Sequence, residues 1–190
     1  MKGPQAAGAA ARAAARERSL GRRHVSGRPT KAVVCLLLVL AAVGWDQGTK
    51  HAARIELSGK PPVFLVDRLL VLRYVENEGA FLSLGARLSR PVRTVTFIAF
   101  PLVVLGCMVV SLLRKGGIGW GTLVGFSLIV GGGAGNLIDR LLRDGRVGDF
   151  IMIGVGGIRT GIFNFADISV LAGCIVLLFS PSAKKPRPES

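Results

Sequence analysis

The stretch GIFNFADISVLAGCIVLLFS, residues 161–180, decides the fold class, because it is a long apolar run with one carboxylate, Asp167, inside it. About 20 mostly apolar residues are enough for a helix to cross the hydrocarbon core of a bilayer. Residues 94–113 and 118–138 form two more apolar runs of this length, and residues 32–44 form a shorter one that continues through Trp45 to Lys50. We therefore expect a membrane all-α four-helix bundle.

The composition supports a membrane protein and argues against a nucleic-acid partner. Half of the 190 residues are hydrophobic and 19% are charged, whereas soluble domains carry about a quarter charged residues. The formal net charge is +14, but the basic residues border apolar runs instead of forming a patch on a polar surface. Cys35, Cys107 and Cys174 stand singly in apolar runs, so we expect packing residues and not disulfides or metal ligands.

The two ends of the chain differ from its centre. Residues 1–31 form an Ala/Arg tract with eight Lys or Arg and one acid, Glu17. We expect a disordered cytoplasmic arm, although organellar transit peptides have a similar composition. After the arm we expect a four-span domain over residues 32–181 and a cytoplasmic tail over residues 182–190. The first apolar run also has the features of a signal peptide, but it continues directly into WDQGTK at residues 45–50.

The distribution of basic residues predicts the orientation. With four spans, both termini share one side, which holds eight Lys or Arg in the arm, two at positions 114–115 and three in the tail. The remaining 12 are spread over longer loops, so the bias places both termini in the cytoplasm. Nine of the 11 acids lie on the other side or at the outer helix ends, which indicates an active site near the outer face.

The outer loop between the first two spans has the composition of a small β-sheet. Residues 63–66 and 69–75 are rich in β-formers, and Asp67-Arg68 between them is a possible turn. We expect a small extracytoplasmic β-sheet between spans 1 and 2, followed by a short interfacial segment at residues 81–88. The GGGAG run at residues 131–135 is expected to allow close helix packing, because no GK[ST] follows it as a phosphate loop would require.

Two aspartates carry the strongest chemical signal. An ionisable side chain inside a bilayer costs ~2.5–3.5 kcal/mol or more and by default marks function. Asp167 lies six residues into the fourth span, and Asp149 precedes that span in a loop. Two nearby carboxyls that share a proton give one base and one acid, which can activate water against an amide carbonyl. For Asp167, a position in the first turn of a helix is an equally good explanation without chemistry.

Other charged residues allow two interpretations each. Asp46 and Lys50 are spaced for an i,i+4 ion pair. This pair is either a weak, exposed contact on the helix or a contact that fixes the helix end beside a site. Asn136 and Arg140 share one helix face, and Arg140 either reaches the lipid headgroups or holds a carboxylate in a bidentate fork.

The sequence has too few histidines for a His-based metal site or a Ser-His-Asp triad. The chain has two histidines, His24 and His51, so we expect no metal and no Ser-His-Asp triad. A Ser-Lys dyad from Lys60 with Ser58 or Ser83 remains conceivable.

Five blocks occur in a recognisable order: WDQGTK (45–50), YVENEGAF (74–81), GGGAGNLIDRL (131–141), VGDF (147–150) and FNFAD (163–167). Together they resemble lipoprotein signal peptidase (signal peptidase II), a family of aspartic peptidases of the bacterial inner membrane. The resemblance implies cleavage of a diacylglyceryl-modified prolipoprotein just before its lipidated Cys, without a cofactor. We expect membrane lipids as further partners and a monomer.

The resemblance also implies roles for individual residues. The catalytic pair falls on Asp149 and Asp167. The positions that support the pair or contact substrate are Asp46, Lys50, Asn77, Asn136, Asp139, Arg140 and Asn164. The chain departs from the family in a shortened NEGAF block, in Gly148 before the aspartate, and in a Gly-rich loop at residues 151–162.

Three other functions fit parts of the pattern. A proton-coupled transporter would use Asp167 as a relay and tolerate loss of Asp149. A membrane scaffold would need neither carboxylate for chemistry. A Ser-Lys signal peptidase would depend on Lys60.

Overall fold

The computed structural model describes residues 28–66, 69–79, 85, 88–114, 118–155 and 158–180. Most of the predicted arm, the turn at residues 67–68, most of the interfacial segment and the tail lie outside these residues. The last four residues of the predicted arm belong instead to the first described helix, α2 (Arg28–Leu57).

Helices dominate the described part of the chain. After α2 come a continuous helical rod made of α3 (Arg90–Thr94), η2 (Val95–Ala99) and α4 (Phe100–Arg114), then α5 (Trp120–Leu142) and α6 (Phe165–Phe179). Within the described ranges, three helices of 29, 25 and 23 residues are long and apolar enough to cross a membrane. The fourth expected span is a shorter apolar helix, because α6 has 15 residues, or about 22 Å at ~1.5 Å per residue.

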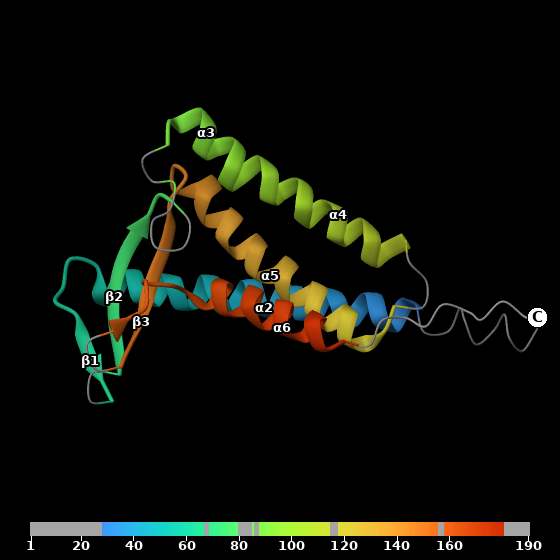
Figure 1. Cartoon of the computed structure of the whole chain (residues 1–190), viewed down its shortest axis with the longest axis horizontal. Helices are drawn as coiled ribbons and strands as arrows, with labels where there is room; N and C mark the ends of the chain where they lie inside the picture. Colours follow the sequence, from blue (N-terminus) through green and yellow to red (C-terminus); the bar gives the residue numbers. More distant parts are fainter. Residues whose placement is uncertain are drawn as a thin grey trace, which may run out of the picture.

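Helix α5 lies at the centre of the helical layer and contacts α2, α4 and α6 (Figure 1). Its glycines make this possible, as the GGGAG run predicts. A Cβ built on Gly131 would lie 2.6 Å from Cβ of Ala42, and one built on Gly132 would collide with the carbonyl oxygen of Ala166. The backbones of α2 and α6 therefore approach α5 at distances that only glycine permits.

A four-stranded antiparallel sheet in the order β1-β2-β3-β4 stands at one end of the helices (Figure 1). Strands β1 (Val63–Leu65) and β2 (Leu70–Asn77) confirm the sheet expected between the first two spans. Strands β3 (Val147–Val155) and β4 (Ile158–Arg159) were not expected, since this segment was interpreted as a Gly-rich loop. Its Val and Ile residues favour a strand, and pairing with β2 outweighs its glycines.

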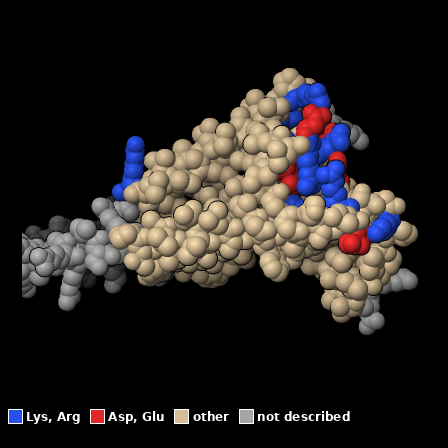
Figure 2. Space-filling view, turned by 180° about the vertical axis from the view of Figure 1, so that it is seen from behind, with Lys and Arg blue, Asp and Glu red and all other residues tan. Residues whose placement is uncertain are grey.

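The outer surface of the helices is apolar. Large hydrophobic side chains are exposed along them, including Leu36, Leu37, Leu40, Phe100, Val103, Leu171, Leu178 and Phe179. Cys107 and Cys174, expected to pack inside, are exposed on the same surface. Figure 2 shows most charged side chains gathered at the sheet end, basic side chains at the opposite end of the helices, and an uncharged surface between them. This distribution suits helices that face lipid and a sheet at the membrane boundary.

The close packing of α5 predicts that Gly132→Ala destabilises the protein by about 1–3 kcal/mol, because the added Cβ meets a backbone carbonyl that cannot move aside. Gly106→Ala on α4 is the matched control, since no neighbouring atom of the described residues lies within 4 Å of its Cβ position. Thermal unfolding in detergent should show a lower midpoint for the first variant only. Equal midpoints for the two variants would contradict close packing at Gly132.

Candidate active site

Asp149 lies in β3, paired with Val75 of β2, and not in a loop as expected. Its side chain is only 4% exposed. Nδ2 of Asn77, at the end of β2, donates to Oδ2 of Asp149 at 2.9 Å. Nδ2 of Asn164 donates to Oδ1 at 2.6 Å. Both carboxyl oxygens are therefore held by amide donors from separate segments.

Asp167 is the third residue of α6 and not a mid-helix residue, because α6 begins at Phe165. It forms a capping box with Asn164: the Asp167 N–H donates to Oδ1 of Asn164 at 3.0 Å, and the Asn164 N–H donates to Oδ2 of Asp167 at 3.1 Å. Nδ2 of Asn136 donates to Oδ1 of Asp167 at 2.9 Å. Asp167 therefore lies in the first turn of a helix, as one of the two explanations from the sequence has it, and it also accepts a hydrogen bond from another helix through Asn136.

Asn164 brings the two aspartates together. Its side-chain amide donates to Asp149 while its backbone N–H donates to Asp167, and the whole residue is buried. Asp149 is buried, whereas Asp167 is partly exposed. The structure therefore places two carboxylates around one asparagine, with access from the side of Asp167.

Burial raises the pKa of the Asp149 carboxyl from 3.8 to about 6. This value of about 6 is the net result of several effects: burial is the largest, the nearby Asp167 carboxylate also raises the pKa because like charges resist joint ionisation, and amide donation from Asn77 and Asn164 and the charge of Lys50 lower it. Both protonation states of Asp149 are consequently accessible near neutral pH.

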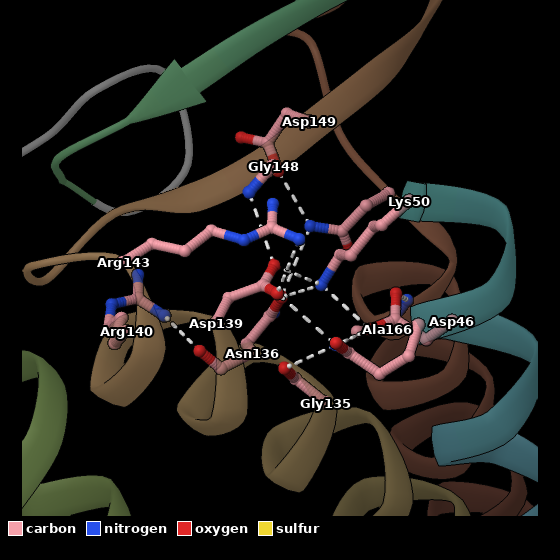
Figure 3. A network of polar contacts seen from close by, with 12 residues as sticks. Asp46, Lys50, Gly135, Asn136, Asp139, Arg140, Arg143, Gly148, Asp149 and Ala166 are labelled. Atoms are coloured by element: carbon pink, nitrogen blue, oxygen red, sulfur yellow. Dashed lines mark hydrogen bonds and ion pairs between the residues drawn. The ribbon is translucent and has the colours of Figure 1, made fainter. Parts of the chain in front are cut away.

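Lys50 is fully buried at the centre of a polar network (Figure 3). Its Nζ lies 2.7 Å from Oδ2 of Asp46 and 3.0 Å from Oδ2 of Asp139, and it donates to Oδ1 of Asn136 at 2.9 Å. The predicted i,i+4 pair with Asp46 is therefore only one of its three contacts. Since Lys50 can only donate, it turns the oxygen of Asn136 toward itself and the Nδ2 group toward Asp167.

Asp46 and Asp139 each make further contacts. The backbone N–H of Ala166, at the start of α6, donates to Oδ1 of Asp46 at 2.9 Å. The backbone N–H of Gly148, next to Asp149, donates to Oδ2 of Asp139 at 3.2 Å. These bonds attach the segments that carry Asp167 and Asp149 to the same buried network.

The sequence analysis missed two residues of the buried polar network, Gln47 and Arg143. Nε2 of Gln47 lies within hydrogen-bond distance of Asp46, Asp139 and the carbonyl of Gly135. Arg143 reaches Asp139 at 3.7 Å and donates to the Tyr74 hydroxyl at 2.9 Å. The position of Gln47 inside the WDQGTK block was the available signal, whereas nothing in the sequence singled out Arg143.

Arg140 does not hold a carboxylate in a fork. In the described part of the chain it has no ion pair within 4.0 Å. Its Nη2 donates to the carbonyl of Gly79 at 2.8 Å, and its guanidinium lies over the ring of Phe97, 5.5 Å from the centroid.

The alternative sites receive no geometric support. Lys60, proposed for a Ser-Lys dyad, lies in an exposed pair with Glu56 at 3.7 Å. Ser83 lies outside the described residues. Among the described residues, no group of three or more His, Cys, Asp or Glu side chains could hold a metal ion.

The fold and site define a membrane protein with two neighbouring carboxylates, Asp149 buried and Asp167 partly exposed, where a small sheet meets the helices. The family profile described as Signal peptidase (SPase) II matches residues 38–181. The chain therefore belongs to the signal peptidase II family, which makes it a protease of a bacterial membrane.

Named relatives agree with this assignment. A lipoprotein signal peptidase of Leifsonia xyli subsp. xyli is 36% identical over 152 residues, covering 75% of this chain and 66% of the relative. One from Xylella fastidiosa (strain M12) is 35% identical over 150 residues, covering 78% and 89%. One from Hydrogenovibrio crunogenus is 32% identical over 160 residues, covering 84% and 91%.

Two solved structures, described as bacterial membrane enzymes determined by the in meso method at 2.3 Å and 1.9 Å resolution, share the fold. Each has a TM-score of 0.67 and covers 76% of this chain, at 27% and 26% identity. The match covers 85% of the first structure and 90% of the second.

The buried network predicts that Lys50→Met destabilises the protein by about 3–5 kcal/mol, because it leaves the buried carboxylate of Asp46 without its cation and Asp139 with Arg143 alone, at 3.7 Å. Lys60→Met is the control, since its exposed pair is worth at most about 1 kcal/mol. Thermal unfolding in detergent measures both. A Lys50→Met protein as stable as the Lys60→Met protein would refute the role of the network.

Proposed function

We propose that this protein is an aspartic endopeptidase that removes the signal peptide from diacylglyceryl-modified prolipoproteins, cleaving just before the lipidated Cys. The observation that carries the proposal is the contact of one buried residue, Asn164, with both Asp149 and Asp167. The family assignment and the name lipoprotein signal peptidase of the relatives supply the substrate.

In the proposed reaction, Asp149 and Asp167 are the catalytic residues and hold one water between them. The ionised carboxylate removes a proton from the water as its oxygen attacks the scissile carbonyl carbon. The protonated carboxyl donates its proton to the carbonyl oxygen. Collapse of the tetrahedral intermediate then breaks the C–N bond, and a proton passes to the leaving amine. Because the pKa of Asp149 is raised to about 6, chiefly by burial, we assign to Asp149 the proton that the pair carries below about pH 6.

The asparagines position the two acids in this scheme. The side-chain amides of Asn77 and Asn164 donate hydrogen bonds to the two oxygens of Asp149, and that of Asn136 donates to one oxygen of Asp167. Behind them, Lys50 with Asp46 and Asp139 fixes the orientation of the Asn136 amide. We assign Arg140 to the substrate side, because it lines the region between Gly79 and Phe97 next to the pair.

We further propose four spans, with α6 as the short fourth, both termini in the cytoplasm and the catalytic pair near the outer face. The support is the charged boundary at the sheet end in Figure 2 and the excess of basic residues near the termini. The acyl chains of the substrate would lie against the apolar helix surface, and the enzyme would act as a monomer.

Asp149→Asn and Asp167→Asn should each abolish processing while the protein still folds, because Asn keeps the shape of the side chain but cannot transfer the proton. The assay uses purified protein with lipidated and unlipidated precursors, with and without a chelator. Only the lipidated precursor should be cleaved, and chelation should have no effect. Glu56→Gln, an exposed change at the sheet end, is the active control. Full processing by either Asp variant would exclude the proposed pair.

The pH profile gives an independent prediction. Loss of the Asp149 proton as pH rises through about 6 should lower kcat/KM, so the profile should have an alkaline limb near this value. Donation from Asn77 lowers the pKa of Asp149, so Asn77→Ala should move the limb to higher pH. Initial rates over a pH series test both statements. A limb that stays in place or moves to lower pH in Asn77→Ala would contradict this assignment of the proton.

A further inference from the structure

A second polar feature lies beside the candidate active site, between the start of the α3–η2–α4 rod and the end of α5. It is a cleft of about 290 Å³. Three arginines and one carboxylate, Asp144, line it together with uncharged residues: Arg90, Arg93, Thr94, Phe97, Ile98, Arg140, Leu141, Asp144 and Gly145. The cleft is therefore basic, and the proposed peptidase reaction gives a task to none of its residues except Arg140.

Arg140 has an unused donor at this cleft. Among the described residues, its buried Nε has no hydrogen-bond partner and its side chain forms no ion pair within 4.0 Å. A buried donor without a partner costs about 1–3 kcal/mol. Such a cost is recovered when an anionic ligand supplies the missing acceptor.

Arg90 and Arg93 are held by contacts that an anion can replace. Nη2 of Arg90 lies 2.6 Å from Oδ2 of Asp144, but the two side chains are 75% and 66% exposed, so the pair is worth little. Arg93 pairs with Glu78, which also binds Arg146 at 3.2 Å and therefore keeps a cation if Arg93 turns away. Arg93 also lies near the turn at Gly145, where a Cβ would be 4.0 Å from its Nη2.

The cleft is lined by both charged and apolar side chains. Arg90 and Arg93 stand in the first turns of the rod, whereas Phe97 and Ile98 follow where the rod becomes apolar. The lining thus changes from charged to apolar along the rod. A ligand that suits it has an anionic head and an apolar body.

We propose that this cleft binds the phosphate group of an anionic phospholipid headgroup. The guanidinium fork matches phosphate oxygens in geometry and charge. Phe97, Ile98 and Leu141 would contact the glycerol and the first acyl carbons. Asp144 competes with the phosphate for Arg90, so it sets the affinity of the site.

The test is a binding titration of the full chain in detergent, followed by thermal unfolding, with phosphatidylglycerol, diacylglycerol and inorganic phosphate as separate probes. Phosphatidylglycerol should raise the unfolding midpoint saturably, whereas diacylglycerol, which lacks the phosphate, should not. Inorganic phosphate should bind more weakly than the lipid, because it makes no apolar contacts. Equal affinity for free phosphate would overturn the lipid as the source of the anion, and equal binding of diacylglycerol would overturn the phosphate site itself.

Two variants should change the affinity for phosphatidylglycerol in opposite directions. Arg90→Gln should weaken phosphatidylglycerol binding by roughly tenfold. Asp144→Asn should tighten it, because it frees Arg90, and Asn suits the positive φ of 53° at this position. Arg54→Gln, an exposed arginine of α2 that does not line the cleft, is the control and should leave the affinity unchanged. Weaker binding by Asp144→Asn, or equal losses in Arg90→Gln and Arg54→Gln, would overturn the proposal.

Discussion

The buried ammonium of Lys50 is the constraint on which the rest of the structure depends. A charge in the interior of a membrane protein must be paired there, because neither lipid nor bulk water can solvate it. Lys50 meets this demand with two carboxylates and one amide oxygen, contributed by α2 and α5. The same carboxylates accept backbone N–H groups of Ala166 and Gly148. One ion therefore sets the positions of two helices, the start of a third and the first residues of β3.

The charged groups that hold the site together are those of Lys50, Asp46 and Asp139. They are separate from the carboxyls of Asp149 and Asp167, which are proposed to react. Asparagine amides lie between Lys50 and the two acids, so each acid receives neutral donors and no direct ion pair within 4.0 Å among the described residues. A direct ion pair would hold a carboxylate ionised, whereas amide donors together with burial leave the pKa of Asp149 near 6. A general acid or base works best with a pKa close to the working pH.

The sequence predicted the local features well and the distant contacts poorly. The long apolar runs predicted membrane helices from their length and composition, and the GGGAG run predicted the close packing of α5. The blocks around Asp149 and Asp167 identified the family, which the comparisons confirm. The sequence analysis missed the strand that carries Asp149, because the glycines of β3 obscure its β-forming residues and its pairing partner lies about 70 residues earlier. It also treated Lys50 as the partner of Asp46 alone, since Asn136 and Asp139 approach only after α2 packs on α5.

The central claim is that the carboxyls of Asp149 and Asp167 meet and influence each other. Infrared titration of the carboxyl C=O band in the full-length protein tests it directly. The wild type should show a protonated carboxyl that titrates near pH 6, and this band should be absent in an Asp149→Asn protein. In an Asp167→Asn protein the band should titrate at lower pH, because the neighbouring negative charge is gone. An unchanged titration after loss of Asp167 would mean that the two acids do not form one site.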